Sequence, residues 1–477
     1  MLSHMCGSGG GEGPTPSTEE GMNTSLHTTT TTMATQTDTH SQNHSEMNEL
    51  PPPRMISQRA HQTLAFPTFS SNYTKMIQAN LYDKLTNPKG IINLAQAVNR
   101  LMEEEVLARL NMADALTLTA KHQYYSDTNG IPELRTAIAK LLTRHHKPQN
   151  SINPDNLIVM NGITACLDAL SHTLCDPDDV VITPTPVYGR IYTNFHDRSA
   201  ATVIPLVCSQ EDDFALNVKD LEKLIEKTES EGRCVRACVL LHPHNPLGHI
   251  YSTAQLRSIM EICAQHEVHV IIDEIYAFSI YNKEIKFNSV LGFESLPDPQ
   301  RTHVLWGFSK DFSIPGFRLG VIHSLNPWVL SCVTTLSHYH SCPQVIQHAA
   351  ATIINDEEWC DGFYLPTNQE RLAKAHHKIC QRLQEMEIAV CKGQGGLYVW
   401  ANLQAYLQPC TEEREMALFM ALVDGGVCIL PGKKLYCVNP GWFRIIFAVP
   451  DEELEEGLSR IEVVLYVWKK NIESDSS

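Results

Sequence analysis

Short apolar runs rich in valine, isoleucine and leucine alternate along most of this chain with segments of helical periodicity. The apolar runs lie at 157–160, 180–183, 237–241, 268–272 and 304–308, and helical stretches include 133–143, 167–174 and 253–265. Runs this short and this apolar are typical of parallel strands that are buried on both faces. The alternation therefore predicts an α/β fold in which one mostly parallel sheet is flanked by helices.

Chain length and local composition indicate how the sequence is divided. With 477 residues, the chain is long enough for one large α/β domain and a smaller one. Residues 1–60 hold too little apolar surface to offset the entropy lost on ordering, so we expect a disordered tail. We expect the large domain at 116–357 and a small α+β domain at 358–470, with strands near 396–401 and 443–448. The segment 61–115 is expected to pack beside the small domain, and 471–477 to form a second disordered tail.

Lys310 lies at the end of the apolar run 304–308, separated from it by Ser309 alone. A lysine in this position either extends its amine to solvent or holds it in a desolvated site. Desolvation favours the neutral amine, and a neutral amine can form a Schiff base with an aldehyde cofactor. For a lysine considered alone the solvent-exposed interpretation is preferred. Four further segments of this chain reverse that preference.

The run 268–272 predicts a buried strand that carries Asp273 at its C-terminal end. A carboxylate in such a place requires a cation. A protonated pyridine nitrogen is one, and keeping it charged turns the ring into an electron sink. Tyr276 lies three residues further on, where it can donate to a phenolic oxygen of the ring. Walker B strands share the Asp-Glu ending, but the chain has no Gly-x-x-x-x-Gly-Lys-Ser/Thr sequence, which excludes that interpretation.

Three other segments each have a structural and a functional interpretation. Asn245, in Asn-Pro-Leu-Gly, belongs to a turn when it is considered alone. Gly162 and Thr164 lie where an expected strand gives way to a helix, so backbone N–H groups and a hydroxyl there predict an anion site. Arg444 interrupts an apolar run, and its guanidinium either forms a structural salt bridge or binds a carboxylate through two hydrogen bonds.

Taken in order, these segments resemble the class I aminotransferase family of fold-type-I pyridoxal-phosphate enzymes. Within it, Asn-Pro-Lys-Gly-Ile-Ile at 87–92, Ser-Lys-Asp at 309–311, Pro-Gly-Phe-Arg at 315–318 and Pro-Gly-Trp-Phe-Arg at 440–444 are similar to the 1-aminocyclopropane-1-carboxylate (ACC) synthase branch and its animal homologues. The resemblance extends from about residue 87 to residue 447. It implies a large domain with a mostly parallel mixed sheet, a smaller α+β domain and pyridoxal 5'-phosphate as the cofactor.

The resemblance implies a role for each residue that matches the cofactor-binding motif. Lys310 would form the Schiff base and later move the substrate α-proton. Asp273 would pair with the pyridinium nitrogen, while Tyr276 and Asn245 would hydrogen-bond the ring oxygen. Tyr188, in Pro-Thr-Pro-Val-Tyr, matches the aromatic residue that stacks on the ring.

Phosphate and substrate contacts follow from the same resemblance. Ile163 and Thr164 match the phosphate-binding turn at the start of a helix, and Arg318 supplies a guanidinium for the phosphate. Arg444 would hold the substrate α-carboxylate, and Ala97 matches a second substrate-binding position. Binding energy from the carboxylate would orient the reacting Cα–H bond over the ring.

Three positions depart from the family pattern. Val98 stands where the synthase branch has a glutamate, and valine cannot balance a sulfonium charge, which argues against S-adenosylmethionine as the substrate. Gly307 replaces a phosphate-binding serine of aspartate-aminotransferase-type members, and one lost hydroxyl contact weakens cofactor binding by about 1 kcal/mol. Thr128 occupies the place of the tyrosine that reaches the neighbouring subunit's phosphate, so Tyr125 is the candidate for that contact.

Composition narrows the class of partners. A formal net charge of −17 argues against nucleic acid and anionic membrane surfaces. No apolar stretch reaches the length of a membrane span, and the first residues lack the apolar core of a signal peptide. The 15 cysteines include no Cys-x-x-Cys pair and are expected to be reduced thiols in the cytosol, while paired histidines without a third ligand predict no metal site.

We therefore expect a cytosolic homodimer that binds pyridoxal phosphate and an α-amino acid. Aldimine formation followed by α-proton abstraction leads to transamination, β-elimination or γ-elimination, and the sequence does not choose among them. A cysteine-conjugate β-lyase would use the same residues. The alternative from another class is a pseudoenzyme, a binding or scaffold protein that keeps the fold without turnover, for which Val98 and Gly307 argue.

Overall fold

The computed structural model of the protein describes residues 55–65 and 71–475. Most of the expected N-terminal tail at 1–60 lies outside these residues. Helix α1 spans Gln58–Ala65, α2 spans Ser71–Ala79, and the last helix, α15, spans Asp451–Asp475. The helix α15 thus continues into the segment 471–477 that we expected to be a tail.

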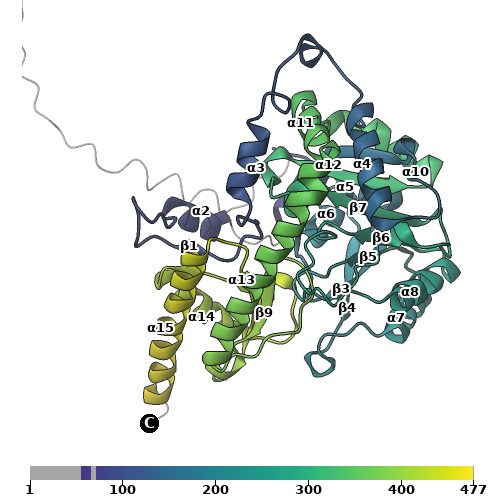
Figure 1. Ribbon diagram of the computed structural model, residues 1–477. Coiled ribbons are helices and arrows are strands. Elements are labelled where there is room, and N and C mark those ends of the chain that lie inside the picture. The colour runs from purple at the N-terminus through teal and green to yellow at the C-terminus, as the bar shows by residue number, and fades with distance from the viewer. Residues whose placement is uncertain (1–54, 66–70, 476–477) are drawn as a thin grey trace, which may run out of the picture. The chain divides into compact units, whose positions relative to one another are not determined.

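A seven-stranded sheet forms the larger part of the fold, as the sequence predicts (Figure 1). Its strands are β2 (Leu157–Asn161), β3 (Val180–Thr185), β4 (Thr202–Val207), β5 (Val235–Leu241), β6 (His269–Asp273), β7 (Thr302–Gly307) and β8 (Leu319–Ser324). Their order is β2-β8-β7-β6-β5-β3-β4, and only β8 is antiparallel to its neighbours. The five predicted strands are confirmed, whereas β4 and β8 were not predicted.

Alternate side chains of each strand enter different hydrophobic clusters, because successive residues point to opposite faces of a sheet. On β6, Val270 and Ile272 pack into the cluster that includes Leu256 and Ile259 of helix α8 (Thr253–Gln265), whereas Ile271 packs with the cluster around Leu170. The helices that border the sheet are α4 (Pro132–His146), α5 (Ile163–Leu174), α6 (Arg190–His196), α7 (Val218–Ser230), α8, α10 (Pro327–Leu336) and α11 (Gln344–Asn355). Both faces of the sheet are therefore buried, which explains the continuous apolar runs.

A second set of strands lies mostly in the later part of the chain. The three-stranded antiparallel sheet has the order β11-β12-β9, with β11 at Leu430–Pro431, β12 at Trp442–Ile446 and β9 at Tyr398–Asn402. Strands near 396–401 and 443–448 were predicted and are confirmed as β9 and β12. Figure 1 shows helices α13 (Leu365–Glu385), α14 (Glu412–Asp424) and α15 gathered around β9 and β1.

The short strand β1 (Ile92–Asn93) joins this second part of the fold although it comes early in the sequence. It pairs in parallel with β10 (Val427–Cys428). The segment continues to hydrogen-bond after the strand, because the backbone N–H of Ile446 donates to the carbonyl oxygen of Leu94 over 2.8 Å. Residues 95–98 are thereby held next to the end of β12.

The topology brings one end of several strands together. Leu241 pairs with Asp273, and Asp273 pairs with Leu305, so the C-terminal ends of β5, β6 and β7 lie at one edge of the sheet. Because β8 is antiparallel, its first residue, Leu319, lies at the same edge, opposite Asn161 at the end of β2. Residues just beyond these ends converge, as they do in other open α/β sheets.

A buried carboxylate links α14 to the turns that flank β11 and β12. Glu415 accepts hydrogen bonds from the backbone N–H of Lys433 over 2.8 Å and from that of Gly441 over 2.6 Å. Replacing it with alanine leaves two buried donors without partners, so we expect Glu415→Ala to lower the free energy of unfolding by about 3 kcal/mol. Urea denaturation of the full-length protein measures the change. The control is Glu413→Ala, an exposed glutamate of the same helix, for which we expect a change within about 0.5 kcal/mol, and equal losses in the two variants would contradict the prediction.

Candidate active site

A cavity of about 360 Å³ lies at the edge of the sheet where the strand ends converge. Ten residues that the sequence singled out line it, and they come from the loops after β2, β3, β5, β6 and β7, from the turn before β8, from β12 and from the segment after β1. They are Ala97, Ile163, Thr164, Tyr188, Asn245, Asp273, Tyr276, Lys310, Arg318 and Arg444. Segments more than 300 residues apart in the sequence thus contribute to one cavity.

Lys310 lies in the single helical turn α9 (Phe308–Asp311), directly after β7. Its Nζ donates a hydrogen bond to the carbonyl oxygen of Ala97. Burial lowers the pKa of Lys310 to about 8, with further lowering by Arg444, whereas Asp273 acts in the opposite direction. A larger fraction of this amine is therefore neutral near neutral pH than in an ordinary lysine, and the neutral amine is the nucleophile. The solvent-exposed interpretation of Lys310 does not hold.

Asp273 ends β6 and is only 6% exposed. Its Oδ1 accepts a hydrogen bond from the backbone N–H of Ile275 over 3.1 Å, and it forms no ion pair with any described residue. Burial raises the pKa of Asp273 to about 7. A cation next to a buried carboxyl group that has no ion-pair partner stabilises its ionised form. The protonated nitrogen of a pyridine ring fits that requirement.

A candidate anion site lies at the start of α5. Gly162 precedes the helix with φ at +83°, and a Cβ atom there would lie 2.5 Å from Nη2 of Arg318, so glycine permits the close approach of the guanidinium. Arg318 donates to the carbonyl oxygen of Pro315 over 3.0 Å and has no ion pair among the described residues. The first N–H groups of a 12-residue helix and an uncompensated guanidinium therefore face the same part of the cavity, an arrangement that fits a phosphate group.

Arg444, on β12, is 4% exposed. Its Nη1 donates to Oδ1 of Asn245 over 2.9 Å and its Nη2 donates to the carbonyl oxygen of Ala95 over 2.6 Å, while its Nε has no hydrogen-bond partner. Arg444 has no carboxylate partner in the part of the chain that the structure describes, so the structural salt bridge is not observed. A buried guanidinium without a counter-charge is suited to bind a carboxylate.

Three polar or aromatic residues complete the wall. Tyr276 is buried, and its ring packs edge-on against Tyr398 with the centroids 5.5 Å apart. Asn245 lies in the predicted turn, and because its Oδ1 already accepts from Arg444, its amide NH₂ is left to donate into the cavity. Tyr188 follows β3 and is exposed, as an aromatic ring that covers a planar ligand would be before the ligand binds.

The structure does not bring Tyr125 to the cavity. Its side chain is fully exposed in the segment between the short helix η3 (Ala120–Gln123) and α4. Thr128, the alternative position, accepts a hydrogen bond from the Ser337 hydroxyl over 2.9 Å. Within one chain, neither residue lines the cavity.

Several lining residues were not singled out from the sequence. They are Gln96, Leu167, Leu241, Ile275, Ser309 and Pro315, whereas Val98, which also lines the cavity, is a departure from the family pattern that the sequence shows. Almost all of them lie within three residues of a predicted site residue in the sequence. This closeness in sequence is the signal that could have identified them. His242, which follows β5, accepts a hydrogen bond from the backbone N–H of Tyr251 over 3.3 Å, and burial lowers its pKa to about 4. Its role is structural.

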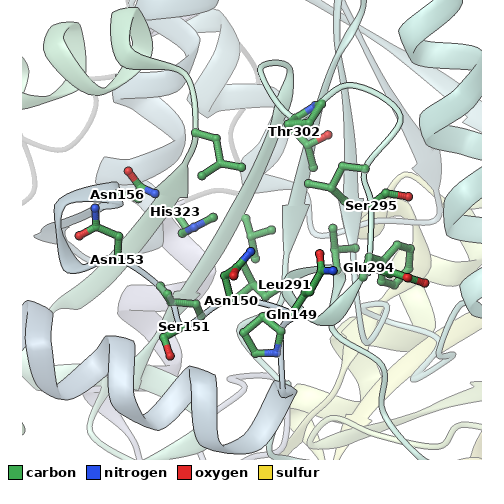
Figure 2. Close-up of a pocket in the computed structure, with 18 residues that line it drawn as sticks. Gln149, Asn150, Ser151, Asn153, Asn156, Leu291, Glu294, Ser295, Thr302 and His323 are labelled. Atoms are coloured by element: carbon green, nitrogen blue, oxygen red, sulfur yellow. The ribbon is translucent and has the colours of Figure 1, made fainter.

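A second cavity, of about 410 Å³, lies at the opposite edge of the sheet and is shown in Figure 2. Thr302 begins β7 there, and His323 lies near the end of the antiparallel β8. The labelled side chains are mostly neutral amides and hydroxyls, and no lysine or arginine lines the cavity. Burial lowers the pKa of His323 to about 4, so it is neutral as well. This cavity lacks the nucleophile and the charges of the first one.

Residues 55–65 and 71–475 contain neither a metal site nor a membrane-spanning helix. No group of three or more histidine, cysteine, aspartate or glutamate side chains is arranged to hold a metal ion there. The same residues include no helix that is both long and apolar enough to span a membrane.

The fold is that of the fold-type-I class of pyridoxal-phosphate-dependent transferases, and Lys310, Asp273 and the candidate anion site lie at the C-terminal edge of its sheet. Residues 89–461 match the model of the family described as aminotransferase class I and II, and the chain belongs to that family. The resemblance found in the sequence is confirmed.

Known proteins support the assignment. The mouse protein named probable inactive 1-aminocyclopropane-1-carboxylate synthase-like protein 2 is 36% identical over 400 residues, which cover 83% of this chain and 69% of that protein. The mouse 1-aminocyclopropane-1-carboxylate synthase-like protein 1 is 34% identical, with 83% and 80% covered. The crystal structure of an aromatic aminotransferase from Pyrococcus horikoshii OT3 has a TM-score of 0.67 at 24% identity, covers 80% of this chain and 96% of its own, and shares the fold.

The buried carboxyl group of Asp273 predicts a pH-dependent stability. The pKa of Asp273 is about 7 in the folded chain, above the ordinary value of 3.8, so its contribution to stability is complete below about pH 4 and is lost as the pH rises through 7. In cofactor-free protein, Asp273→Asn should raise the free energy of unfolding by about 3 kcal/mol at pH 8, and this gain should shrink by at least about 1.5 kcal/mol at pH 5.

Urea denaturation at the two pH values measures the difference. The control is Asp424→Asn, an exposed residue at the end of α14 with no hydrogen bond or ion pair among the described side chains, which should change stability by less than about 0.5 kcal/mol at either pH. A gain for Asp273→Asn that is independent of pH would show that its carboxyl group is not desolvated in the folded chain.

Proposed function

We propose that this protein binds pyridoxal 5'-phosphate and acts on an α-amino acid by transamination or elimination. The observation that carries the proposal is the set of charges around one cavity. Lys310, Asp273, Arg318 and Arg444 all line it, and none has a described side chain of opposite charge within ion-pairing distance. Such an enzyme must hold four groups, and each has a matching side chain here. The Lys310 amine suits the aldehyde of the cofactor, and the Asp273 carboxylate suits its ring nitrogen. The Arg318 guanidinium suits the phosphate, and the Arg444 guanidinium suits the carboxylate of the substrate.

The residues that would hold the cofactor come from five segments of the chain. Ile163, Thr164 and Arg318 would bind the phosphate group, and Asp273 would keep the ring nitrogen protonated. Tyr276 and Asn245 would donate hydrogen bonds to the ring oxygen, and Tyr188 would cover the face of the ring. When bound, pyridoxal phosphate supplies an electron sink that stabilises negative charge at the substrate α-carbon.

Two residues act on the substrate. Arg444 binds the α-carboxylate with its guanidinium, and the buried surroundings strengthen that contact. Lys310, whose pKa is lowered to about 8, removes the α-proton with its neutral amine and returns it later. The carbonyl oxygen of Ala97 accepts a hydrogen bond from Nζ of Lys310 and so holds the amine in the cavity.

ACC synthesis from S-adenosylmethionine is not the activity that we propose. Val98 lines the cavity, and its methyl groups offer no charge to a sulfonium group. Among the residues that line the cavity Asp273 is the single carboxylate, and it serves the ring nitrogen. Val98 also supports a second candidate, a protein that binds the cofactor without turnover, and the name of the similar mouse protein, probable inactive, is in line with it.

The visible absorption spectrum tests the primary proposal. With added pyridoxal phosphate, the native protein should show a protonated Schiff-base band, and Lys310→Ala should abolish it, since only this lysine lines the cavity. Lys392→Ala, at an exposed lysine without an ion pair among the described residues, is the control and should keep the band. No band at saturating cofactor would contradict the proposal.

The same preparation separates an enzyme from a binding protein. Amino acids, with S-adenosylmethionine among them, are screened for a shift of the band and for exchange of the α-hydrogen in deuterated water. Exchange requires proton removal by Lys310 and indicates an enzyme. A stable band without exchange for any amino acid supports the protein without turnover, and exchange with S-adenosylmethionine would overturn the conclusion drawn from Val98.

We further infer a division into a large domain at 116–357 and a small domain at 358–470, with 61–115 packing on the small one. The seven-stranded sheet supports this division, because it lies wholly within 157–324, and so does the pairing of β1 with β10. Met102, Val106 and Leu110 pack instead with α4 and α11 of the large domain, so the contacts support packing on the small domain only for the earlier part of 61–115. The cytosol is the compartment that we propose, and the 14 described cysteines, all free thiols, are in line with it.

We also propose that the protein is a homodimer in which Tyr125 reaches the cofactor phosphate of the neighbouring subunit. The segment between α3 (Glu103–Leu110) and α4 appears in Figure 1 as a dark blue loop that extends beyond the helices. Several large apolar side chains in and beside it are exposed: Leu107, Met112, Leu118, Tyr124 and Tyr125. Apolar side chains gathered in one segment indicate an interaction surface.

Coexpression of two defective chains tests the role of Tyr125. Tyr125→Ala should weaken cofactor binding in its own homodimer, and Lys310→Ala should abolish the band. In a hybrid dimer, one of the two sites combines the intact Lys310 of one subunit with the intact Tyr125 of the other, so random pairing restores about a quarter of the sites. The band of the mixture is compared with that of each variant alone. If Tyr125 acts within its own subunit, no site is restored.

A further inference from the structure

A buried carboxyl group that the proposed function does not use lies next to Lys310. Asp311 ends the helical turn α9 and is completely buried, and its side chain does not line the cavity of the candidate active site. It is also the third residue of the Ser-Lys-Asp motif at 309–311. Because burying a carboxylate away from water is unfavourable, its place in the fold requires compensating contacts.

Neutral donors satisfy both oxygens of this carboxyl group. Oδ1 of Asp311 accepts a hydrogen bond from the Ser279 hydroxyl over 2.7 Å, Oδ2 accepts one from Nε1 of Trp306 over 3.0 Å, and no described residue forms an ion pair with it. Burial raises the pKa of Asp311 to about 7, whereas the hydrogen bonds from Ser279 and Trp306 act in the opposite direction. The contacts are directional, so they fix the position of Asp311 relative to both donors.

Both donors belong to segments that carry residues of the candidate active site. Ser279 follows Tyr276 by three residues in the loop after β6, and its backbone N–H donates to the carbonyl oxygen of Tyr276 over 2.9 Å. Trp306 lies on β7, whose end leads into α9. Asp311 therefore connects the turn that carries Lys310 to the loop that carries Tyr276 and to β7.

The turn α9 depends on such support. It has only four residues, and a single helical turn is unstable by itself because ordering its backbone costs more entropy than its few hydrogen bonds offset. Gly307, which precedes the turn, offers no side chain to cap it. The carbonyl oxygen of Asp311 accepts a further hydrogen bond, from the Tyr364 hydroxyl over 3.0 Å. Side chain and backbone of Asp311 thus both hold the end of the turn, directly after Lys310.

We propose that Asp311 is a positioning residue that orients Lys310 for Schiff-base formation. The proposal rests on the proposed function and assigns a further residue to it. Asp311 acts through geometry rather than through charge, because its carboxyl group lies outside the cavity in which Nζ of Lys310 donates to the carbonyl oxygen of Ala97. Without its two side-chain hydrogen bonds the turn α9 is free to move, and Lys310 can leave Ala97 for solvent.

Two substitutions of Asp311 separate geometry from charge. Asp311→Asn removes the charge and keeps both hydrogen bonds. The amide oxygen accepts from Nε1 of Trp306, which can only donate, and the amide NH₂ donates to the Ser279 hydroxyl, which can also accept. Asp311→Ala removes both hydrogen bonds. A positioning role predicts that asparagine preserves the placement of Lys310 and that alanine does not.

The pKa of Lys310 reports this placement without the cofactor. Competitive labelling of full-length, cofactor-free protein with acetic anhydride over a series of pH values, followed by mass spectrometry of the peptide that contains Lys310, measures it. Burial lowers this pKa to about 8, Arg444 and Arg318 lower it further, and Asp273 raises it. Asp311→Ala should move the pKa toward the ordinary value of 10.5, because the amine regains water, and Asp311→Asn should leave it unchanged.

Two milder variants keep the test decisive where Asp311→Ala does not fold. Ser279→Ala and Trp306→Phe each remove one of the two hydrogen bonds, and each should raise the pKa of Lys310 by a smaller amount. With pyridoxal phosphate added, Asp311→Ala should need about tenfold more cofactor to reach half of its Schiff-base band, and Asp311→Asn should restore the native requirement.

The matched control is Glu415→Ala, which also removes a buried carboxyl group with two donors, here the backbone N–H groups of Lys433 and Gly441. It should destabilise the fold and leave the pKa of Lys310 unchanged. An unchanged pKa in Asp311→Ala and in both milder variants would overturn the proposal, as would an equal rise in Glu415→Ala.

These outcomes are distinguishable from failure of the proposed function. Labelling needs no cofactor, so the pKa of Lys310 is measurable even if the native protein shows no Schiff-base band. An unchanged pKa in the Asp311 variants, in turn, leaves the band of the native protein and its dependence on Lys310 intact.

Discussion

The candidate site depends on charged groups that are removed from water without being paired with one another. Lys310, Asp273 and Arg444 are desolvated, and for each of them burial is the largest influence on its pKa. Such groups destabilise a chain on their own, because a buried charge without a partner is unfavourable. The extensive apolar packing of two covered sheet faces offsets this destabilisation. The same unpaired state leaves each group available to a ligand of complementary charge.

The sequence allowed the central strands to be predicted because they are buried on both faces and therefore read as uninterrupted apolar runs. It did not reveal β4, an edge strand that contains Pro205 and is largely half-exposed, or β8, which includes Gly320 and His323. The site residues were predictable one by one, since each follows a strand end or lies in a recognisable motif. The contacts of Lys310 with Ala97 and of Arg444 with Ala95 were not predictable, because they come from packing between segments more than 200 residues apart.

Membership of the family establishes the fold and the chemistry that the family uses, but the reaction depends on individual side chains. Val98 shows the difference. The residue does not disturb the backbone that carries Ala97 to Lys310, so the cavity keeps its form while one of its walls loses a charged group. Relatives with similar sequences can therefore share the fold and the lysine and still differ in whether, and on what, they act.

The path of the chain through the candidate site also governs when the site can come into existence. Arg444 donates to Ala95, 349 residues earlier in the sequence, and Lys310 donates to Ala97, 213 residues earlier. Contacts of this span form late, because the entropy of closing such long loops must be overcome before the contacts stabilise the structure. During synthesis on the ribosome, the large sheet can be assembled well before residue 444 has emerged. The newly made chain therefore passes through a period in which Lys310 is present but Arg444 is not.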